Sequence, residues 1–186
     1  MAADELLLRQ APHSPQAEQA VLGSMLIDPD CIKDVMDKLQ PEDFYLRANR
    51  DIFETIYHMF IYSRPIDGVT VAGEMERNGV YNDNTRDYLV QLMDVTPTSA
   101  NVMEYVKIVL DKSLMRQVAA AAGSITAMVQ EGNGDAGDML ESAEQKVYAI
   151  RRGRSAQNMV TVSMVLQDVM NRLAELTASG GKTLPG

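Results

Sequence analysis

The fold is decided by residues 114–150, LMRQVAAAAGSITAMVQEGNGDAGDMLESAEQKVYAI, which hold two apolar stripes around a polar loop. The apolar residues recur every three or four positions, as on one face of a helix. They are Leu114, Val118, Ala121, Ile125 and Met128 in the first stripe, and Leu140, Ala143, Val147 and Ile150 in the second. The segment 131–135, EGNGD, has the composition of a loop. This pattern predicts two antiparallel helices joined by a short loop, an αα-hairpin.

The residues before the hairpin show the same helical periodicity, interrupted by proline and glycine. Ser14-Pro15 is typical of a helix start, and Asp28-Pro29 ends that first helix. We expect helices over about 15–27, 31–39, 47–63, 69–78 and 85–93, and a long helix over 100–130 that begins the hairpin. No segment alternates with the period of two that strands require. The sequence therefore predicts an all-α chain with a compact helical globule.

The residues after the hairpin predict one more amphipathic helix, over 161–178. Its apolar stripe consists of Val162, Val165, Leu166, Val169, Leu173 and Leu176. A polar joint separates it from the hairpin, so its apolar face requires a partner. We expect these segments: an arm over 1–12, a helical domain over 13–112, the hairpin over 113–152, a basic joint over 153–160, the tethered linker helix over 161–178 and the start of a linker over 179–186.

Composition bounds the class of protein. The chain has 186 residues, of which 46% are apolar, so it can form a core. Its formal net charge of −9 argues against nucleic acid as the main ligand, because phosphate binding needs a basic face. The single cysteine, Cys31, fits a reducing cytoplasm, and the N-terminus has neither a secretory signal nor a membrane span.

The residues give no candidate for an active site or a metal site. His13 and His58 lie far apart, and Cys31 has no partner at ligand spacing. Gly181-Lys182-Thr183 resembles the end of a phosphate-binding loop, but the motif's earlier glycine falls at Leu176, inside a predicted helix. We therefore expect no catalytic residue, metal or cofactor in these 186 residues.

Arg151, Arg152 and Arg154 form the densest positive cluster of this acidic chain. They could contact a nucleic-acid backbone. Alternatively, they are solvated cations at the C-terminus of a helix, where they interact favourably with the helix dipole. The sequence favours the second interpretation.

Five blocks in order resemble the N-terminal domain of bacterial replicative DNA helicases of the DnaB type. They are PQAEQAVLG at 15–23, MLID at 25–28, LQPEDF at 39–44, RPID at 64–67 and PTSAN at 97–101. Ile52-Phe53, Tyr105, Ile108-Val109 and Arg116 extend the resemblance. It departs from the family at Asn49, where the family usually has histidine, so no role is carried over to that position.

The resemblance implies an assembly and partner-docking domain that pairs through its hairpin. Three such pairs form a collar on a hexameric ring in this family. The implied dimer interface includes Leu114, Val118, Ala121, Leu140 and Val147. The implied linker helix, 161–178, docks on the motor domain of a neighbouring subunit.

The resemblance also implies that a motor domain, absent here, follows the linker. The parent would use ATP and Mg to unwind DNA in the cytoplasm, holding the DNA through that motor domain. Implied protein partners are primase and, in some bacteria, a helicase loader. Three other interpretations compete: a free-standing helical adaptor, a small enzyme and a helix-turn-helix DNA binder. The adaptor is the alternative that composition permits, whereas the enzyme lacks a site and the DNA binder lacks a basic recognition helix.

Overall fold

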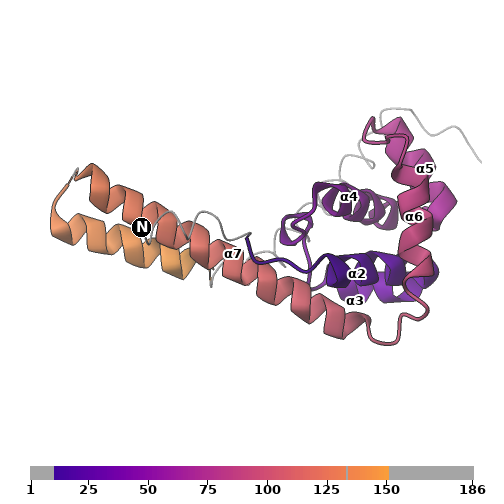
Figure 1. Cartoon of the computed structure of the whole chain (residues 1–186), viewed down its shortest axis with the longest axis horizontal. Helices are drawn as coiled ribbons and strands as arrows, with labels where there is room; N and C mark the ends of the chain where they lie inside the picture. The colour runs from indigo at the N-terminus through magenta and orange to yellow at the C-terminus, as the bar shows by residue number, and fades with distance from the viewer. Residues whose placement is uncertain (1–10, 133, 151–186) are drawn as a thin grey trace, which may run out of the picture. The chain divides into compact units, whose positions relative to one another are not determined.

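The computed structural model describes residues 11–132 and 134–150, and these are helical with no strand among them (Figure 1). This confirms the all-α prediction. The helices are α2 (Pro15–Ile27), α3 (Ile32–Met36), α4 (Arg47–Ile61), α5 (Gly68–Arg77), α6 (Thr85–Asp94) and α7 (Val102–Glu131). Two 3-10 turns, η1 (Pro29–Cys31) and η2 (Pro41–Asp43), and a helix over 136–150 complete the described part. The chain divides into two compact units, Met1–Gln130 and Glu131–Gly186.

Local capping explains where the first helix begins and ends. The Ser14 side chain accepts a hydrogen bond from the Ala17 backbone N–H at 3.4 Å, and Pro15 occupies the first helical position. Asp28 ends α2, and its carboxylate then accepts from the Asp30 N–H at the start of η1. The predicted helix start and stop are both confirmed.

Two sequence predictions differ from the structure. The helix expected over 31–39 is shorter, because η1 and the turn after α3 take up both of its ends. Phe60, which helical periodicity places on the same apolar stripe as Phe53 and Ile56 and so predicts to face inward, is 36% exposed. It lies in the last turn of α4, where the chain reverses through Ser63 at φ 51° and leaves this face uncovered.

The core of the first unit is built around α2, which packs against α4 and α6. Its largest fully buried side chains include Phe44, Phe53 and Leu22. Gly23 allows the close approach of α6, because a Cβ at this position would collide with the Leu92 carbonyl oxygen and the Thr96 hydroxyl. Glycine is therefore required here by packing rather than by backbone conformation.

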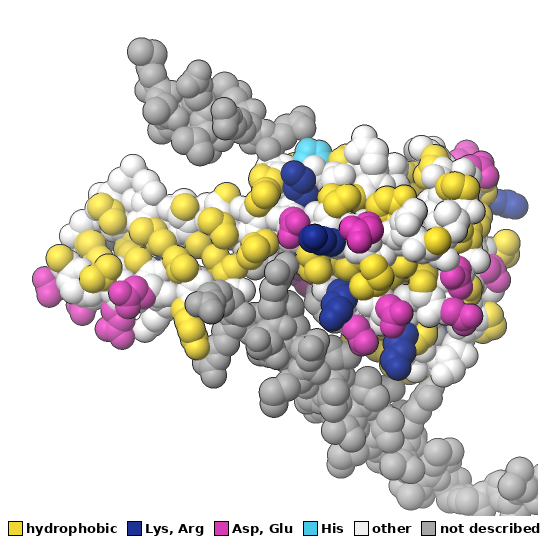
Figure 2. All heavy atoms as spheres, turned by 90° about the horizontal axis from the view of Figure 1, so that it is seen from below, with side chains coloured by type: hydrophobic (Ala, Val, Ile, Leu, Met, Phe, Trp, Pro, Cys, Tyr) yellow, Lys and Arg dark blue, Asp and Glu magenta, His cyan; other side chains and the backbone are white. Residues whose placement is uncertain are grey.

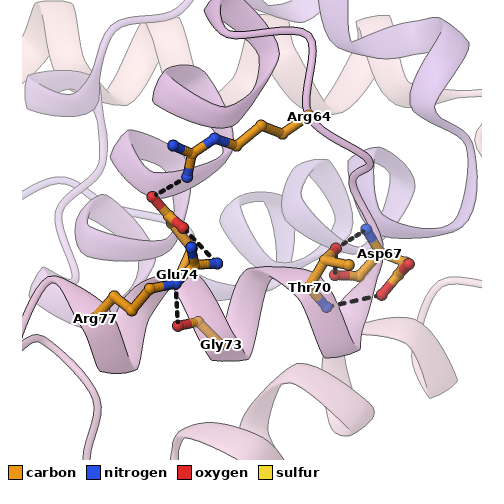
Figure 3. Close-up of polar contacts among 6 residues, drawn as sticks. All are labelled: Arg64, Asp67, Thr70, Gly73, Glu74 and Arg77. Carbon is orange, nitrogen blue, oxygen red and sulfur yellow. Dashed lines mark hydrogen bonds and ion pairs between the residues drawn. The ribbon is translucent and has the colours of Figure 1, made fainter.

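Helix α5 is positioned by polar contacts at its start and its middle (Figure 3). The Asp67 carboxylate accepts from the backbone N–H groups of Val69 and Thr70 at 2.8 and 2.9 Å. The hydrogen bond from the Thr70 N–H contributes most to lowering the pKa of Asp67, and the one from the Val69 N–H lowers it further. Glu74 forms ion pairs with Arg64 at 2.7 Å and Arg77 at 2.8 Å, which tie the end of α4 to α5.

Candidate oligomerisation surface

The distal part of α7 presents apolar side chains to solvent. Val102, Val106 and Val109 are buried in the core, but no residue of α7 after Ser113 is buried. Met115, Val118 and Val129 are exposed, Val129 to 60%. Figure 2, which draws one face of the molecule, shows apolar side chains at its surface. Contiguous apolar surface of this kind is typical of protein–protein interfaces.

The helix over 136–150 is also apolar on an exposed face. Leu140, Val147 and Tyr148 are exposed, Leu140 to 63%. Acidic residues precede and interrupt them, namely Asp135, Asp138, Glu141 and Glu144. An exposed apolar face bordered by charges can bind another protein surface without becoming insoluble.

Of the five predicted interface residues, three are exposed. Val118, Leu140 and Val147 face solvent, whereas Leu114 and Ala121 are half-buried. The prediction missed a second stripe, shifted by one residue, in which Met115, Ala122 and Val129 repeat every seven residues and are exposed. The spacing was visible in the sequence, but two adjacent stripes make one broad apolar face, and periodicity does not say which half is covered. The role of these residues in pairing stays a prediction.

Hydrogen bonds hold α7 at the point where it leaves the core. The Ser113 hydroxyl donates to the Asp43 carboxylate at 2.6 Å, a contact buried from solvent. Arg116 donates to the backbone oxygens of Pro12, at 2.9 Å, and of Asp43, and lies over the Tyr45 ring at 5.7 Å. Burial lowers the pKa of Arg116, and the carboxylates of Glu18 and Asp43 oppose that shift. These contacts fix the start of the exposed stripe relative to the globule.

A buried network of hydrogen bonds centred on Glu18 holds the backbone of Tyr45, whose ring lies under Arg116. Glu18 is 1% exposed, and its carboxylate accepts from the Tyr45 N–H at 2.8 Å, from the Leu46 N–H, and from the Asn49 side chain at 2.8 Å. The Tyr88 hydroxyl donates to Asn49 Oδ1 at 2.6 Å. Burial raises the pKa of Tyr88. The network supplies hydrogen-bond donors to both carboxylate oxygens of Glu18.

Asn49, the position that departs from the resemblance, thus bridges Glu18 to Tyr88. Its amide donates to one partner and accepts from the other, which a neutral histidine could also do. Sequence reasoning missed Glu18 because its partners lie 27 to 31 residues away. Its place beside Ala17 on the buried face of α2 was the available signal.

The remaining predicted sites are only partly within the described residues. Arg151, Arg152, Arg154 and the linker-helix stripe lie outside them, as does Gly181-Lys182-Thr183. Within the described part, no group of three or more His, Cys, Asp or Glu residues could hold a metal ion. None of the helices over that same part is both long and apolar enough to cross a membrane. His58 is exposed.

The chain matches a known protein family and several known proteins. The family model described as DnaB-like helicase N terminal domain matches residues 10–111. The replicative DNA helicase DnaB of Mycobacterium leprae (strain TN) is 34% identical over 179 residues, covering 93% of this chain and 29% of the relative. The replicative DNA helicase DnaB of Pasteurella multocida (strain Pm70) is 30% identical over 174 residues, covering 91% and 37%. The chain thus spans about a third of the length of these relatives.

Solved structures agree with the family match. The N-terminal domain of DnaB helicase from Mycobacterium tuberculosis has a TM-score of 0.69 and 35% identity, and the match covers 76% of this chain and 99% of that one. The corresponding domain from Helicobacter pylori, described with its interactions with primase, has a TM-score of 0.55 and 23% identity over 62% of this chain and 90% of that one. The second likeness shows the fold alone. The family match and its relatives show that this chain belongs to the DnaB-like helicase N-terminal domain family.

Proposed function

We propose that this domain assembles a hexameric replicative DNA helicase by pairing with a second copy and docking partner proteins. The observation that carries the proposal is the exposed apolar face of α7 after Ser113, whereas Val102, Val106 and Val109 in the first half of the same helix are buried. Covering an apolar face of this kind lowers the free energy of the system. Family membership supports a second copy as the partner, and in this proposal the helix over 136–150 contributes Leu140 and Val147.

The parent protein, in this proposal, binds ATP and Mg in a motor domain and unwinds DNA in the cytoplasm. The support is the family match and relatives that are about three times as long as this chain. Residues 161–178 would then dock on a neighbouring motor domain. Because Gly181-Lys182-Thr183 lacks the earlier glycine of a phosphate-binding loop, we expect no ATP hydrolysis from residues 1–186 alone, measured by phosphate release. Robust turnover by the pure chain would contradict the assignment.

Primase is the partner that we propose for the docking role. The Helicobacter pylori domain is described with its interactions with primase, and this chain shares its fold. A helicase loader is a further partner in this proposal. Family resemblance supports both, and a pull-down with purified primase tests the first.

The pairing is tested by sedimentation equilibrium of the whole chain over a wide concentration range. We expect a concentration-dependent dimer that is lost when Val118→Ser and Leu140→Ser are combined, because both side chains are exposed on the proposed surface. The matched control is Val69→Ser on α5, where the side chain is 80% exposed but lies outside that surface. A wild-type chain that stays monomeric at high concentration, or equal loss in the control, would refute the pairing.

A further inference from the structure

A second surface of the first unit is a polar groove along α4, whose lining residues are not part of the proposed pairing surface. One cavity of about 410 Å³ is lined by Asp51, Glu54 and Glu74 among others. A second, of about 280 Å³, continues along α4 toward Asn82. Both are lined by Asp51 and Val80, so the two cavities adjoin. Together they form one elongated groove between α4 on one side and α5 with the following loop on the other.

The groove has acidic groups in excess. Three carboxylates line it, those of Asp51, Glu54 and Glu74, against the single arginine Arg64. Arg64 is already paired with Glu74, and Arg77 pairs with the other oxygen of the same carboxylate (Figure 3). The charge that remains in the groove is therefore that of Asp51 and Glu54.

Those two carboxylates have weak partners. Asp51 lies 3.8 Å from Arg47, whose side chain is almost fully exposed. Glu54 lies 4.0 Å from His58, which is charged only when protonated. Exposed ion pairs at such distances contribute little, so a better-placed cation could replace them. The amide side chains of Asn78 and Asn82 add further acceptors along the groove.

The walls suit a cationic side chain on an aliphatic stem. Met59, Val80 and the Thr55 side chain line the groove beside the carboxylates. Arginine buries its methylene groups against such surface and offers five N–H donors to carboxylates, often two at once. A nucleic-acid backbone does not fit, because its phosphates would meet the carboxylates.

We propose that this groove binds the arginine-rich segment 151–154 of another copy of the chain. Arg151, Arg152 and Arg154 are the densest positive cluster in a chain of net charge −9, which makes them complementary to the groove. In an extended peptide, Arg152 and Arg154 would point to the same side about 7 Å apart. Asp51 and Glu54, one helical turn apart, have Cβ atoms about 5–6 Å apart.

Another copy is the donor because the proposed pairing brings several copies together. The inference rests on the proposed pairing. A paired copy would supply its arginine-rich segment to the groove at high effective concentration. The contact itself does not depend on the apolar surface. It can therefore be measured with a peptide, and its failure is distinguishable from a failure of pairing.

The test is titration of a labelled peptide, residues 147–158 (VYAIRRGRSAQN), with the whole chain, followed by fluorescence anisotropy. The chain carries Arg151→Gln, Arg152→Gln and Arg154→Gln so that its own segment does not compete. We expect saturable binding that weakens strongly between about 20 and about 200 mM salt, as for exposed charges. Adding Asp51→Asn with Glu54→Gln should weaken binding about tenfold.

The matched control is Glu141→Gln with Glu144→Gln, which makes the same change in net charge on the helix over 136–150. It should leave binding within about twofold, because neither carboxylate lines the groove. Glu54→Lys, at a half-exposed side chain, gives a second measure if the double variant folds poorly, and should abolish binding. Thermal melts verify folding of each variant.

Absence of saturable binding, equal losses in both double variants, or equal binding of a peptide with the same residues in scrambled order would overturn the proposal. The combined Val118→Ser and Leu140→Ser variant separates the two proposals. Peptide binding by this monomeric chain would show that the groove works without pairing. Loss of peptide binding in this variant, whose two substitutions do not line the groove, would contradict a site confined to the groove.

Discussion

The two halves of α7 differ in what covers them, although both belong to one uninterrupted helix. Val102, Val106 and Val109 in the first half are buried, and Ser113 ends the buried stretch. Met115, Val118 and Val129 in the second half are exposed. Both halves carry apolar residues at helical spacing. Periodicity therefore shows that a face is apolar, whereas burial depends on whether another segment of the chain reaches it.

The two halves of α7 therefore contribute to stability through different contacts. The first half shares a close-packed core, where the loss of a few methyl groups is costly. The second half gains little from the described residues, so its apolar side chains contribute mainly when a partner covers them. Four substitution pairs, each comparing the globule with exposed helix, test this division.

The largest expected effect comes from truncating an apolar side chain in each region. Phe53→Ala removes a fully buried ring that lies 4.8 Å, centre to centre, from Phe44, and should cost about 3–5 kcal/mol of unfolding free energy. Val129→Ala, at an exposed site, should change it by less than about 0.5 kcal/mol. Urea denaturation at low protein concentration measures both. Comparable losses would show that the distal half of α7 is covered within one chain.

Replacing either of two glycines by alanine should change the stability of the chain in opposite directions. Gly23→Ala places a methyl group against the Leu92 carbonyl and the Thr96 side chain and should cost about 2–3 kcal/mol. Gly123→Ala, in the distal half of α7, meets open space and should stabilise the chain by about 0.5–1 kcal/mol through helix propensity. Thermal melts compare the two. A destabilising Gly123→Ala would indicate that another segment approaches this point.

The buried carboxylate provides the next contrast. Glu18→Gln keeps the shape but turns an amide N–H₂ toward the Tyr45, Leu46 and Asn49 donors, and should cost about 1–3 kcal/mol. Glu141→Gln, on the exposed helix over 136–150, should be nearly neutral. Denaturation curves at neutral pH measure both changes. Equal tolerance of the two substitutions would mean that the network does not hold α2 to α4.

The smallest effect on stability concerns the half-buried thiol of Cys31. Burial, with help from Asp28, raises the pKa of Cys31 to about 11. Because the thiolate is the reactive form, maleimide labelling near pH 8 should be at least about tenfold slower than at an exposed Ser124→Cys in a Cys31→Ala background. The raised pKa also means that stability contributed by the neutral thiol is lost as pH rises from about 9 to about 11. Equal labelling rates would show that Cys31 is exposed.

The helices themselves could be predicted because their signals are local. Ser14 with Pro15 starts α2, and the capping residue Asp67 starts α5. The long helix predicted over 100–130 is confirmed as Val102–Glu131. A hydrogen bond or a proline acts within one turn of the chain, so these features are readable from neighbouring residues.

Part of the candidate surface could also be predicted, but not its limits. Val118, Leu140 and Val147 were identified from spacing and family resemblance, whereas Met115, Val129 and Tyr148 were missed. The acidic groove was not predicted at all. Its carboxylates lie on α4 and α5, and only the packing of those helices brings Glu74 beside the α4 face.

The sequence by itself determined approximately where most of the helices begin and end, that residues 11–132 and 134–150 form no strand, and which family the chain resembles. Only the tertiary structure decided that Glu18 is buried and satisfied, that Asn49 joins it to Tyr88, and that α7 is covered as far as Ser113. The physical reason is the distance along the chain over which each interaction acts. Caps and breaks act between neighbours, whereas burial is decided by segments tens of residues apart that compete for the same apolar face.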